Sequence, residues 1–227
     1  SAAVAGRNSL MPAAQLEIHF LPTDKPMAWP EPVTLRGRHA TLEPLTREHG
    51  DALSEATKDG ELWKLWYTSV PKPEGMMVEI DRRLDLQAAG SMLPFAVLDA
   101  DGVAVGMTTF MNIDAANKRV EIGSTWYARR VQRTALNTEC KFMLMQHAFE
   151  TLGCIAVEYR TSFFNQKSRR AIERLGAKLD GVLRNHQHHT DGSLRDTCVY
   201  SIIQSEWPTV KTHLTFQLEG CPDDFNC

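Results

Sequence analysis

The sequence contains no long apolar run and no excess of charge of one sign. No apolar stretch approaches the roughly 18 residues that span a bilayer, so we expect no membrane-spanning helix. The first twenty residues lack a basic start followed by an apolar block, and we do not expect them to act as a signal peptide. A formal net charge of −3 provides no basic field for nucleic acid or for an anionic membrane. We therefore expect neither as a partner.

Cysteine is scarce and shows no close paired spacing. The cysteines are Cys140, Cys154, Cys198, Cys221 and Cys227. Their odd number argues against a complete disulfide framework, and no CxxC pair indicates a zinc site. We expect reduced thiols, no metal site and a cytoplasmic location.

The composition is that of an ordinary globular protein. Hydrophobic residues make up 43% and charged residues 23% of the 227 residues, which is enough chain for one sizeable core. Residues 1–32 are rich in Ala and Pro and are expected to form an irregular arm. The expected domain covers 33–207, and 208–227 form a C-terminal tail whose order the sequence does not indicate.

Periodicity and turn residues predict a mixture of helices and strands. Helices are expected at 47–58, 74–89, 134–152 and 166–175. Strands are expected at 33–45 (with a turn near Gly37), 93–98, 103–112, 119–127, 154–162, 177–188 and 194–204. A meander followed by a β-α-β-α-β crossover predicts an α+β fold, with a central mixed, mostly antiparallel sheet and helices on both faces.

The segment WYARRVQRTALNTE, from Trp126 to Glu139, combines a strand end, a basic turn and a helix start. A helix start leaves backbone N–H groups unpaired and carries a partial positive charge, so it favours a phosphate. Arg129, Arg130 and Arg133 add charge at the same place. We therefore predict a pyrophosphate-binding turn here, with an exposed basic helix start as the alternative.

The order of elements around this turn resembles the GNAT acyl-CoA N-acyltransferase family, in its RimJ/RimL-like branch. The resemblance covers about 33–207 and is most specific in EIGSTWYARRVQRTALNTECK (121–141), FNQKSRRAIERLGAKLDGVLRNH (164–186) and DTCVYSI (196–202). It implies a GNAT-type fold and acetyl-CoA as co-substrate, with no metal. It also implies direct transfer to a primary amine, either a small molecule or a peptide or protein N-terminus. Family habit further implies a homodimer.

The resemblance assigns cofactor contacts to the basic turn. The family motif Arg/Gln-x-x-Gly-x-Gly/Ala is matched by Arg130, Val131, Gln132, Arg133, Thr134 and Ala135, preceded by Trp126 and Tyr127. Arg133 stands where the first glycine is usual, so it must adopt a suitable backbone conformation. Its guanidinium can in turn add a bidentate phosphate contact.

A second group of expected contacts follows the next strand. The resemblance places Asn165 and Ser168 beside the pantetheine and sulfur of CoA. Lys167 and Arg169 are candidates for contact with the CoA phosphates. Ser168 is a candidate general acid that protonates the departing thiolate. The alternatives are an N-cap role for Asn165, a plain first-turn serine and a solvated charged face.

Glu121 is the candidate general base. An alkylammonium has no lone pair, so a base or a water chain must remove its proton before attack on a thioester. Glu121 matches a recurrent acidic position of the branch, although an outward strand glutamate in a cross-strand pair is an alternative. A backbone N–H near 125–127, where the strand is expected to splay, is the candidate donor to the thioester oxygen.

Other patterns leave alternatives open. His186, His188 and His189 resemble a metal tract but fit a polar hairpin tip better. Trp63, Trp66 and Tyr67 suit a core or an interface, and they also suit contact with the acceptor. A catalytically weak, acyl-CoA-binding regulatory protein of the same fold is the alternative function, and transfer of a longer acyl group is a third possibility.

Overall fold

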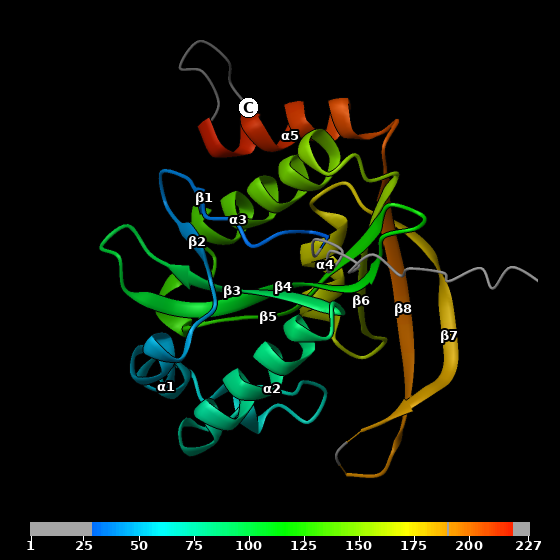
Figure 1. Cartoon of the computed structure of the whole chain (residues 1–227). Coiled ribbons are helices and arrows are strands. Elements are labelled where there is room, and N and C mark those ends of the chain that lie inside the picture. The colour runs from blue at the N-terminus through cyan, green and yellow to red at the C-terminus, as the bar shows by residue number, and fades with distance from the viewer. Residues whose placement is uncertain (1–28, 190, 220–227) are drawn as a thin grey trace, which may run out of the picture.

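An eight-stranded sheet runs through the molecule in the order β1-β2-β3-β4-β5-β6-β8-β7 (Figure 1). The computed structural model describes residues 29–189 and 191–219. The pair β5–β6 is parallel and every other neighbouring pair is antiparallel. The strands are β1 Leu35–Arg36, β2 Thr41–Pro44, β3 Met92–Leu98, β4 Ala104–Asp114, β5 Arg119–Tyr127, β6 Ala156–Ser162, β7 Lys178–His188 and β8 Leu194–Ile203.

Helices cover both faces of this sheet. Figure 1 shows α1 and α2 on one face and α3 and α5 on the other. The helices are α1 Gly50–Lys58, α2 Met76–Ala88, α3 Ala135–Gln146, α4 Gln166–Glu173 and α5 Trp207–Glu219. The predicted mixed, mostly antiparallel sheet between helices is confirmed. Among the described residues, no helix is long and apolar enough to cross a membrane.

The sheet interior explains the apolar runs of the sequence. Strand β3 reads MLPFAVL and is buried along nearly its whole length, because helices cover both of its faces. Helix α3 begins after Thr134, whose hydroxyl accepts a hydrogen bond from Leu136 N at 3.3 Å. Its apolar side chains, including Cys140 and Leu144, are buried against the sheet. The central core is therefore β3, β4 and β5 enclosed between α2 and α3.

The first hairpin is fixed by a carboxylate from α3. The oxygens of Glu139 accept hydrogen bonds from the backbone N–H groups of Arg38, His39 and Ala40 at 2.6–2.8 Å. A Cβ atom on Gly37 would lie 2.4 Å from Glu139 Cδ, so only glycine fits there. The turn expected near Gly37 is confirmed, and its tertiary partner is the start of α3.

The C-terminal segment differs from the expected tail, because residues 207–219 form α5. Trp207, Val210 and Leu214 are buried and lie at helical spacing. The indole Nε1 of Trp207 also donates to Glu150 Oε1 at 2.8 Å. The packed domain thus continues to residue 219, and the boundary expected at 207 is too early. Most of the expected N-terminal arm, 1–28, and residues 220–227 lie outside the described residues.

Two irregularities in β5 shape the centre of the sheet. Its parallel pairing with β6 covers only 119–121 against 156–158, and beyond these residues the two strands diverge. On its other edge β5 carries a bulge, because Ser124 and Thr125 together oppose Thr108 of β4. Ser124 has φ of 47°, in the left-handed region. The splay expected near 125–127 is therefore present and begins at Glu121.

Candidate functional site

The divergence of β5 and β6 brings the two predicted cofactor-binding segments to the same opening. The chain leaves β5 into the basic turn 129–135, and it leaves β6 into 163–168 at the start of α4. Since β5 and β6 are parallel, their carboxyl ends point to the same edge of the sheet. Ligands of open sheets with parallel strands commonly bind at such an edge. The two segments therefore flank one site.

Glu121 lies where the strands separate. Its side chain is buried, at 4% exposure, and Oε2 accepts a hydrogen bond from Asn112 Nδ2 at 2.7 Å. Arg160 Nε of β6 lies 3.4 Å from the same oxygen. A Cβ atom on Gly123 would lie 3.0 Å from Glu121 Oε1 and 2.7 Å from Met111 Sδ, so the glycine of the EIGS sequence leaves room for this carboxylate.

The surroundings of Glu121 favour its protonated form. Burial raises the pKa of this carboxyl above its usual range, and the nearby charge of Glu158 raises it further. The hydrogen bond from Asn112 and the charges of Arg160 and Arg195 oppose the shift without cancelling it. A carboxylate with a raised pKa accepts a proton more readily, as a general base must. The alternative of an outward strand glutamate is wrong, because the side chain is buried.

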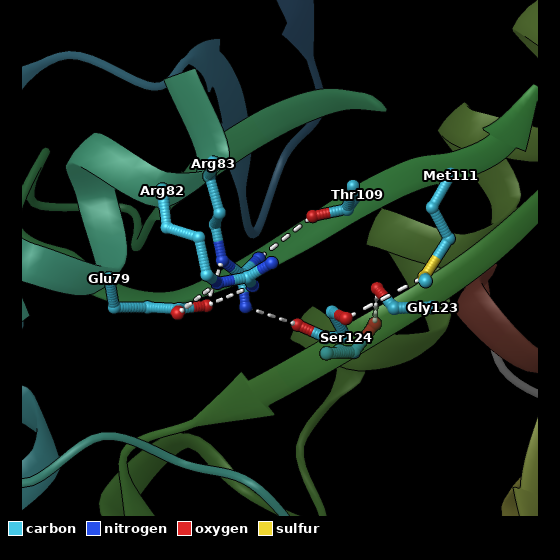
Figure 2. A network of polar contacts seen from close by, with 8 residues as sticks. Glu79, Arg82, Arg83, Thr109, Met111, Gly123 and Ser124 are labelled. Atoms are coloured by element: carbon cyan, nitrogen blue, oxygen red, sulfur yellow. Dashed lines mark hydrogen bonds and ion pairs between the residues drawn. The ribbon is translucent and has the colours of Figure 1, made fainter. Parts of the chain in front are cut away.

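The bulge that follows Glu121 is bound on the α2 side by a buried arginine, as Figure 2 shows. Arg83 is only 2% exposed; its Nη1 donates to Thr109 Oγ1 at 2.8 Å and its Nη2 to the Ser124 carbonyl at 3.2 Å. Its Nε donates to Glu79 Oε1 at 2.7 Å, which compensates the buried charge. Arg83 thus ties helix α2 to the backbone of the bulge.

Backbone direction places an amide at the opening. Ala128 N donates to Val105 O of the β4 side at 2.7 Å. Because successive amides of a strand alternate between its two edges, the N–H of Tyr127 points toward the gap left by β6. The side chains of Trp126 and Tyr127 are buried in the core. A contact from Tyr127 to a ligand in the opening would therefore come from its backbone, whereas the amide of Trp126 points toward β4.

The basic turn is anchored from α1 and from its own strand. The backbone N–H of Arg130 donates to Asp59 Oδ2 at 2.8 Å, and Gln132 Nε2 donates to the Tyr127 carbonyl at 2.9 Å. The Arg130 guanidinium pairs with Asp99 at 3.2 Å. Within residues 29–189 and 191–219, neither Arg129 nor Arg133 forms an ion pair. These two exposed cations can therefore meet an anion.

Arg133 adopts the backbone conformation of the glycine that it replaces. Its φ is 61°, in the left-handed region that glycine enters without steric cost. The backbone path of the motif is thus kept, and the arginine side chain is exposed. Thr134 caps α3 and its hydroxyl donates to Val131 O at 2.8 Å, while Ala135 is the first helical residue. The turn therefore keeps the backbone conformation of the family motif, and pyrophosphate binding there stays a prediction.

The second segment is held mainly by contacts within the protein. Asn165 caps α4, its Oδ1 accepting from Ser168 N at 3.1 Å, and Ser168 is half-buried in the first turn. Arg169 Nε donates to Tyr200 Oη at 2.9 Å, and the guanidinium lies 4.8 Å from the ring centroid of Phe163. The N-cap interpretation of Asn165 is confirmed. The cofactor contacts of all three residues remain predictions.

The sequence did not point to several polar residues near the opening. Asn112 and Arg160 contact Glu121, and Arg83 and Lys141 contact the two sides of the bulge. These four residues come from four different elements, β4, β6, α2 and α3, and no local spacing links them. One pattern in the sequence could have pointed to Arg160: side chains alternate along a strand, so Glu158 and Arg160 of β6 lie on the same face.

The other marked residues take structural positions. His186 Nδ1 lies 3.1 Å from Thr197 Oγ1, and His189 packs against Trp66 at 4.9 Å between ring centroids. Across the described chain, no group of three or more His, Cys, Asp or Glu side chains is arranged to hold a metal. Burial raises the pKa of Cys140 to about 12 and that of Cys154 to about 11, so neither is a reactive thiolate.

Comparison with known proteins gives matches over the same region. Residues 39–178 match the family model of the acetyltransferase (GNAT) domain. The chain is 32% identical over 107 residues to a Bacillus subtilis (strain 168) protein named "Putative ribosomal N-acetyltransferase YdaF". That match covers 47% of this chain and 57% of the relative, so the chain spans little more than half of that relative's length.

Solved structures share the fold. A GCN5-related N-acetyltransferase from Brucella melitensis is 33% identical, with a TM-score of 0.75, over 87% of this chain and 89% of its own. Mycobacterium smegmatis RimJ, solved in complex with CoA-disulfide, is 21% identical with a TM-score of 0.69, over 84% and 96% of the two chains, a likeness of fold alone. The family model covers more than half of the chain, and the chain therefore belongs to the GNAT family of acetyltransferases.

Proposed function

We propose that this protein transfers an acetyl group from acetyl-CoA to a primary amine, directly and in a ternary complex. One observation carries the proposal: the basic turn and the start of α4 flank a single opening, and the buried Glu121 lies where that opening begins. Family membership supports the type of reaction, and the geometry supports the place where it occurs.

The basic turn would bind the pyrophosphate of CoA. Arg129 and Arg133 supply exposed positive charge, and 133–135 supply backbone N–H groups ahead of α3, since the N–H groups of 130–132 already donate within the protein. Asn165, Ser168 and Arg169 lie across the opening, where the pantetheine arm would extend. No metal is needed for any of these contacts.

Glu121 would act as the general base. It takes a proton from the alkylammonium, directly or through water, and the free amine then attacks the thioester carbonyl. A C–N bond forms and the C–S bond breaks, with the Tyr127 N–H available to the developing negative charge on oxygen. Ser168 would return a proton to the departing thiolate.

The acceptor would enter from the face of β6, β8 and β7. A groove of about 680 Å³ lies there, and Arg119, Glu158, Arg160, Leu183 and Val199 are among its lining residues. Arg160 lines this groove and also contacts Glu121, so the side chain of Arg160 lies between the groove and the proposed base. The name of the YdaF relative supports a protein N-terminus as the acceptor, and a small-molecule amine is the second candidate.

Turnover of acetyl-CoA against a mixed panel of peptides and small amines tests the proposal. We expect release of free thiol and an acetylated product that mass spectrometry identifies. Glu121→Gln should lower turnover by about 10²-fold or more, whereas the exposed Glu55→Gln should leave it unchanged. Acetyl-CoA binding with no thiol release from any acceptor would contradict the proposal and favour an acyl-CoA-binding regulatory protein.

The preferred acyl chain length, the oligomeric state and the cellular location are further proposals. Longer acyl-CoA thioesters, used in the same assay, measure the preference for acyl chain length. A homodimer is expected from family habit, and sedimentation at micromolar concentration would contradict it by showing a monomer. A cytoplasmic location also remains a prediction.

A further inference from the structure

A buried lysine lies behind the β5 bulge, on the side opposite to Arg83. Lys141 of α3 is 7% exposed, and its Nζ donates to Thr125 Oγ1 at 2.8 Å and to Thr108 Oγ1 at 3.4 Å. The two threonine hydroxyls are also hydrogen-bonded to each other at 2.8 Å. The ammonium is thus directed at Thr125 of the bulge and at Thr108, the residue that the bulge opposes.

No carboxylate compensates this charge. Among the described residues, Lys141 is in no ion pair, although Arg83 on the other face is paired with Glu79. Burial lowers the pKa of Lys141 from 10.5 to about 8, so the side chain is still mostly charged near neutral pH. An uncompensated buried ammonium disfavours the folded state.

Hydrogen bonding in the bulge does not require this side chain. Thr108 and Thr125 satisfy each other, and Thr125 Oγ1 also lies 3.3 Å from the Gly123 carbonyl, to which it can donate. A methionine would fill a similar volume without a charge. A purely structural role would therefore be better served by an apolar residue.

The Lys141 ammonium lies behind the part of β5 that borders the proposed site. Thr125 is followed by the stretch of β5 whose amides border the opening between β5 and β6. A positive charge held in a low-dielectric interior favours negative charge nearby far more than it would in water. In the proposed reaction, negative charge develops on the thioester oxygen at this opening.

We propose that Lys141 is a positioning residue which, through Thr125, holds an uncompensated positive charge behind the β5 bulge and thereby stabilises negative charge on the thioester oxygen. This inference rests on the proposed acetyl transfer. It assigns to α3 an electrostatic part in the reaction, in addition to its helix start at the pyrophosphate.

The experiment uses Lys141→Met and Lys141→Gln in the full chain. We expect kcat to fall about tenfold or more with the KM for acetyl-CoA nearly unchanged, and the Tm of Lys141→Met to stay equal or rise. The infrared carbonyl stretch of bound ¹³C-acetyl-CoA should shift to higher frequency in both variants, because the carbonyl is less polarised. Lys141→Gln keeps a donor for Thr125 and serves if the methionine variant does not fold.

Thr138→Val is the matched control. Thr138 lies one turn earlier on α3, is similarly buried, and accepts a hydrogen bond from Arg174 Nη2 at 3.0 Å. It should leave kcat and the carbonyl frequency unchanged. A folded Lys141 variant with unaltered kcat and carbonyl frequency overturns the inference, as does a fall in kcat that only follows a fall in Tm. Bound acetyl-CoA with the expected frequency shift but no turnover would overturn the proposed function alone.

Discussion

The two faces of the sheet at the β5 bulge hold their buried cations in opposite ways. On the α2 face, Arg83 is paired with Glu79 and also bonds the Ser124 carbonyl. On the α3 face, the partners of Lys141 within the described part of the chain are the hydroxyls of Thr108 and Thr125 alone. The first arrangement stabilises the fold, whereas the second disfavours it. A buried charge without a counter-charge therefore indicates a function more strongly than a buried ion pair does.

We expect the largest effect on stability from a change on the α2 face, where Arg83 is paired with Glu79. Arg83→Met leaves Glu79 as a half-buried carboxylate that keeps only the partly exposed Arg82 as a partner, and it removes the bonds to Thr109 and Ser124. We expect the free energy of unfolding to fall by about 3–5 kcal/mol, measured by urea denaturation. Adding Glu79→Gln should recover part of the loss. A loss well under about 1 kcal/mol would remove the contrast with the other face.

On the α3 face, removing the charge of Lys141 should change stability in the opposite direction. We expect Lys141→Met to leave the free energy of unfolding unchanged at pH 7 or to raise it by about 1–3 kcal/mol. The pKa of Lys141 is lower in the folded state, so between pH 8 and 10.5 the unfolded state binds more protons and wild-type stability gains with pH. The advantage of the variant should shrink over this range, as parallel denaturation curves would show. An advantage independent of pH would mean that folding does not lower the pKa of Lys141.

Glu121 lies on the same face as Arg83, and its partners should set the pH dependence of turnover. The acid limb of kcat/KM should follow the ionisation of Glu121, because the base works only when deprotonated. Arg160→Gln removes a charge that lowers the pKa of Glu121, so the limb should move to higher pH. Glu158→Gln removes a charge that raises this pKa, so the limb should move to lower pH.

These opposite shifts test Glu121 itself. Each should be smaller than about one pH unit, because both neighbours are partly exposed to solvent. Shifts of the same sign in the two variants would assign the acid limb to a different group. An exposed variant such as Glu55→Gln provides the reference profile.

We expect the smallest effects from replacing Arg133, whose guanidinium is exposed to solvent. Arg133 occupies the left-handed region at φ of 61°, so Arg133→Gly should raise the free energy of unfolding by up to about 1 kcal/mol. If its guanidinium contacts phosphate, the same variant binds acetyl-CoA a few-fold more weakly, and added salt reduces the difference. Calorimetric titration at two salt concentrations checks this. Unchanged affinity would remove Arg133 from the cofactor site.

The sequence predicted the element order well, because helices and strands follow from local spacing. Strand β5 has the predicted bounds, and most other elements differ by a few residues at their ends. The helix expected at 134–152 is α-helical only to Gln146 and continues as a π-helical turn, His147–Thr151. Helix α5 was missed although Trp207, Val210 and Leu214 already had helical spacing. The sequence also predicted the basic turn and singled out Glu121, because both lie in one continuous stretch, 121–141.

By itself, the sequence determined the family's succession of elements, the phosphate-type turn and the carboxylate on β5. Only the tertiary structure decided that Glu121 is buried beside Arg160 and that Arg133 takes the conformation of a glycine. The tertiary structure also placed Arg83 and Lys141 on opposite sides of the same bulge. The physical reason is the distance along the chain over which each kind of interaction acts. Local propensities act over a few residues, whereas burial and charge interaction depend on groups that folding brings together from distant parts of the chain.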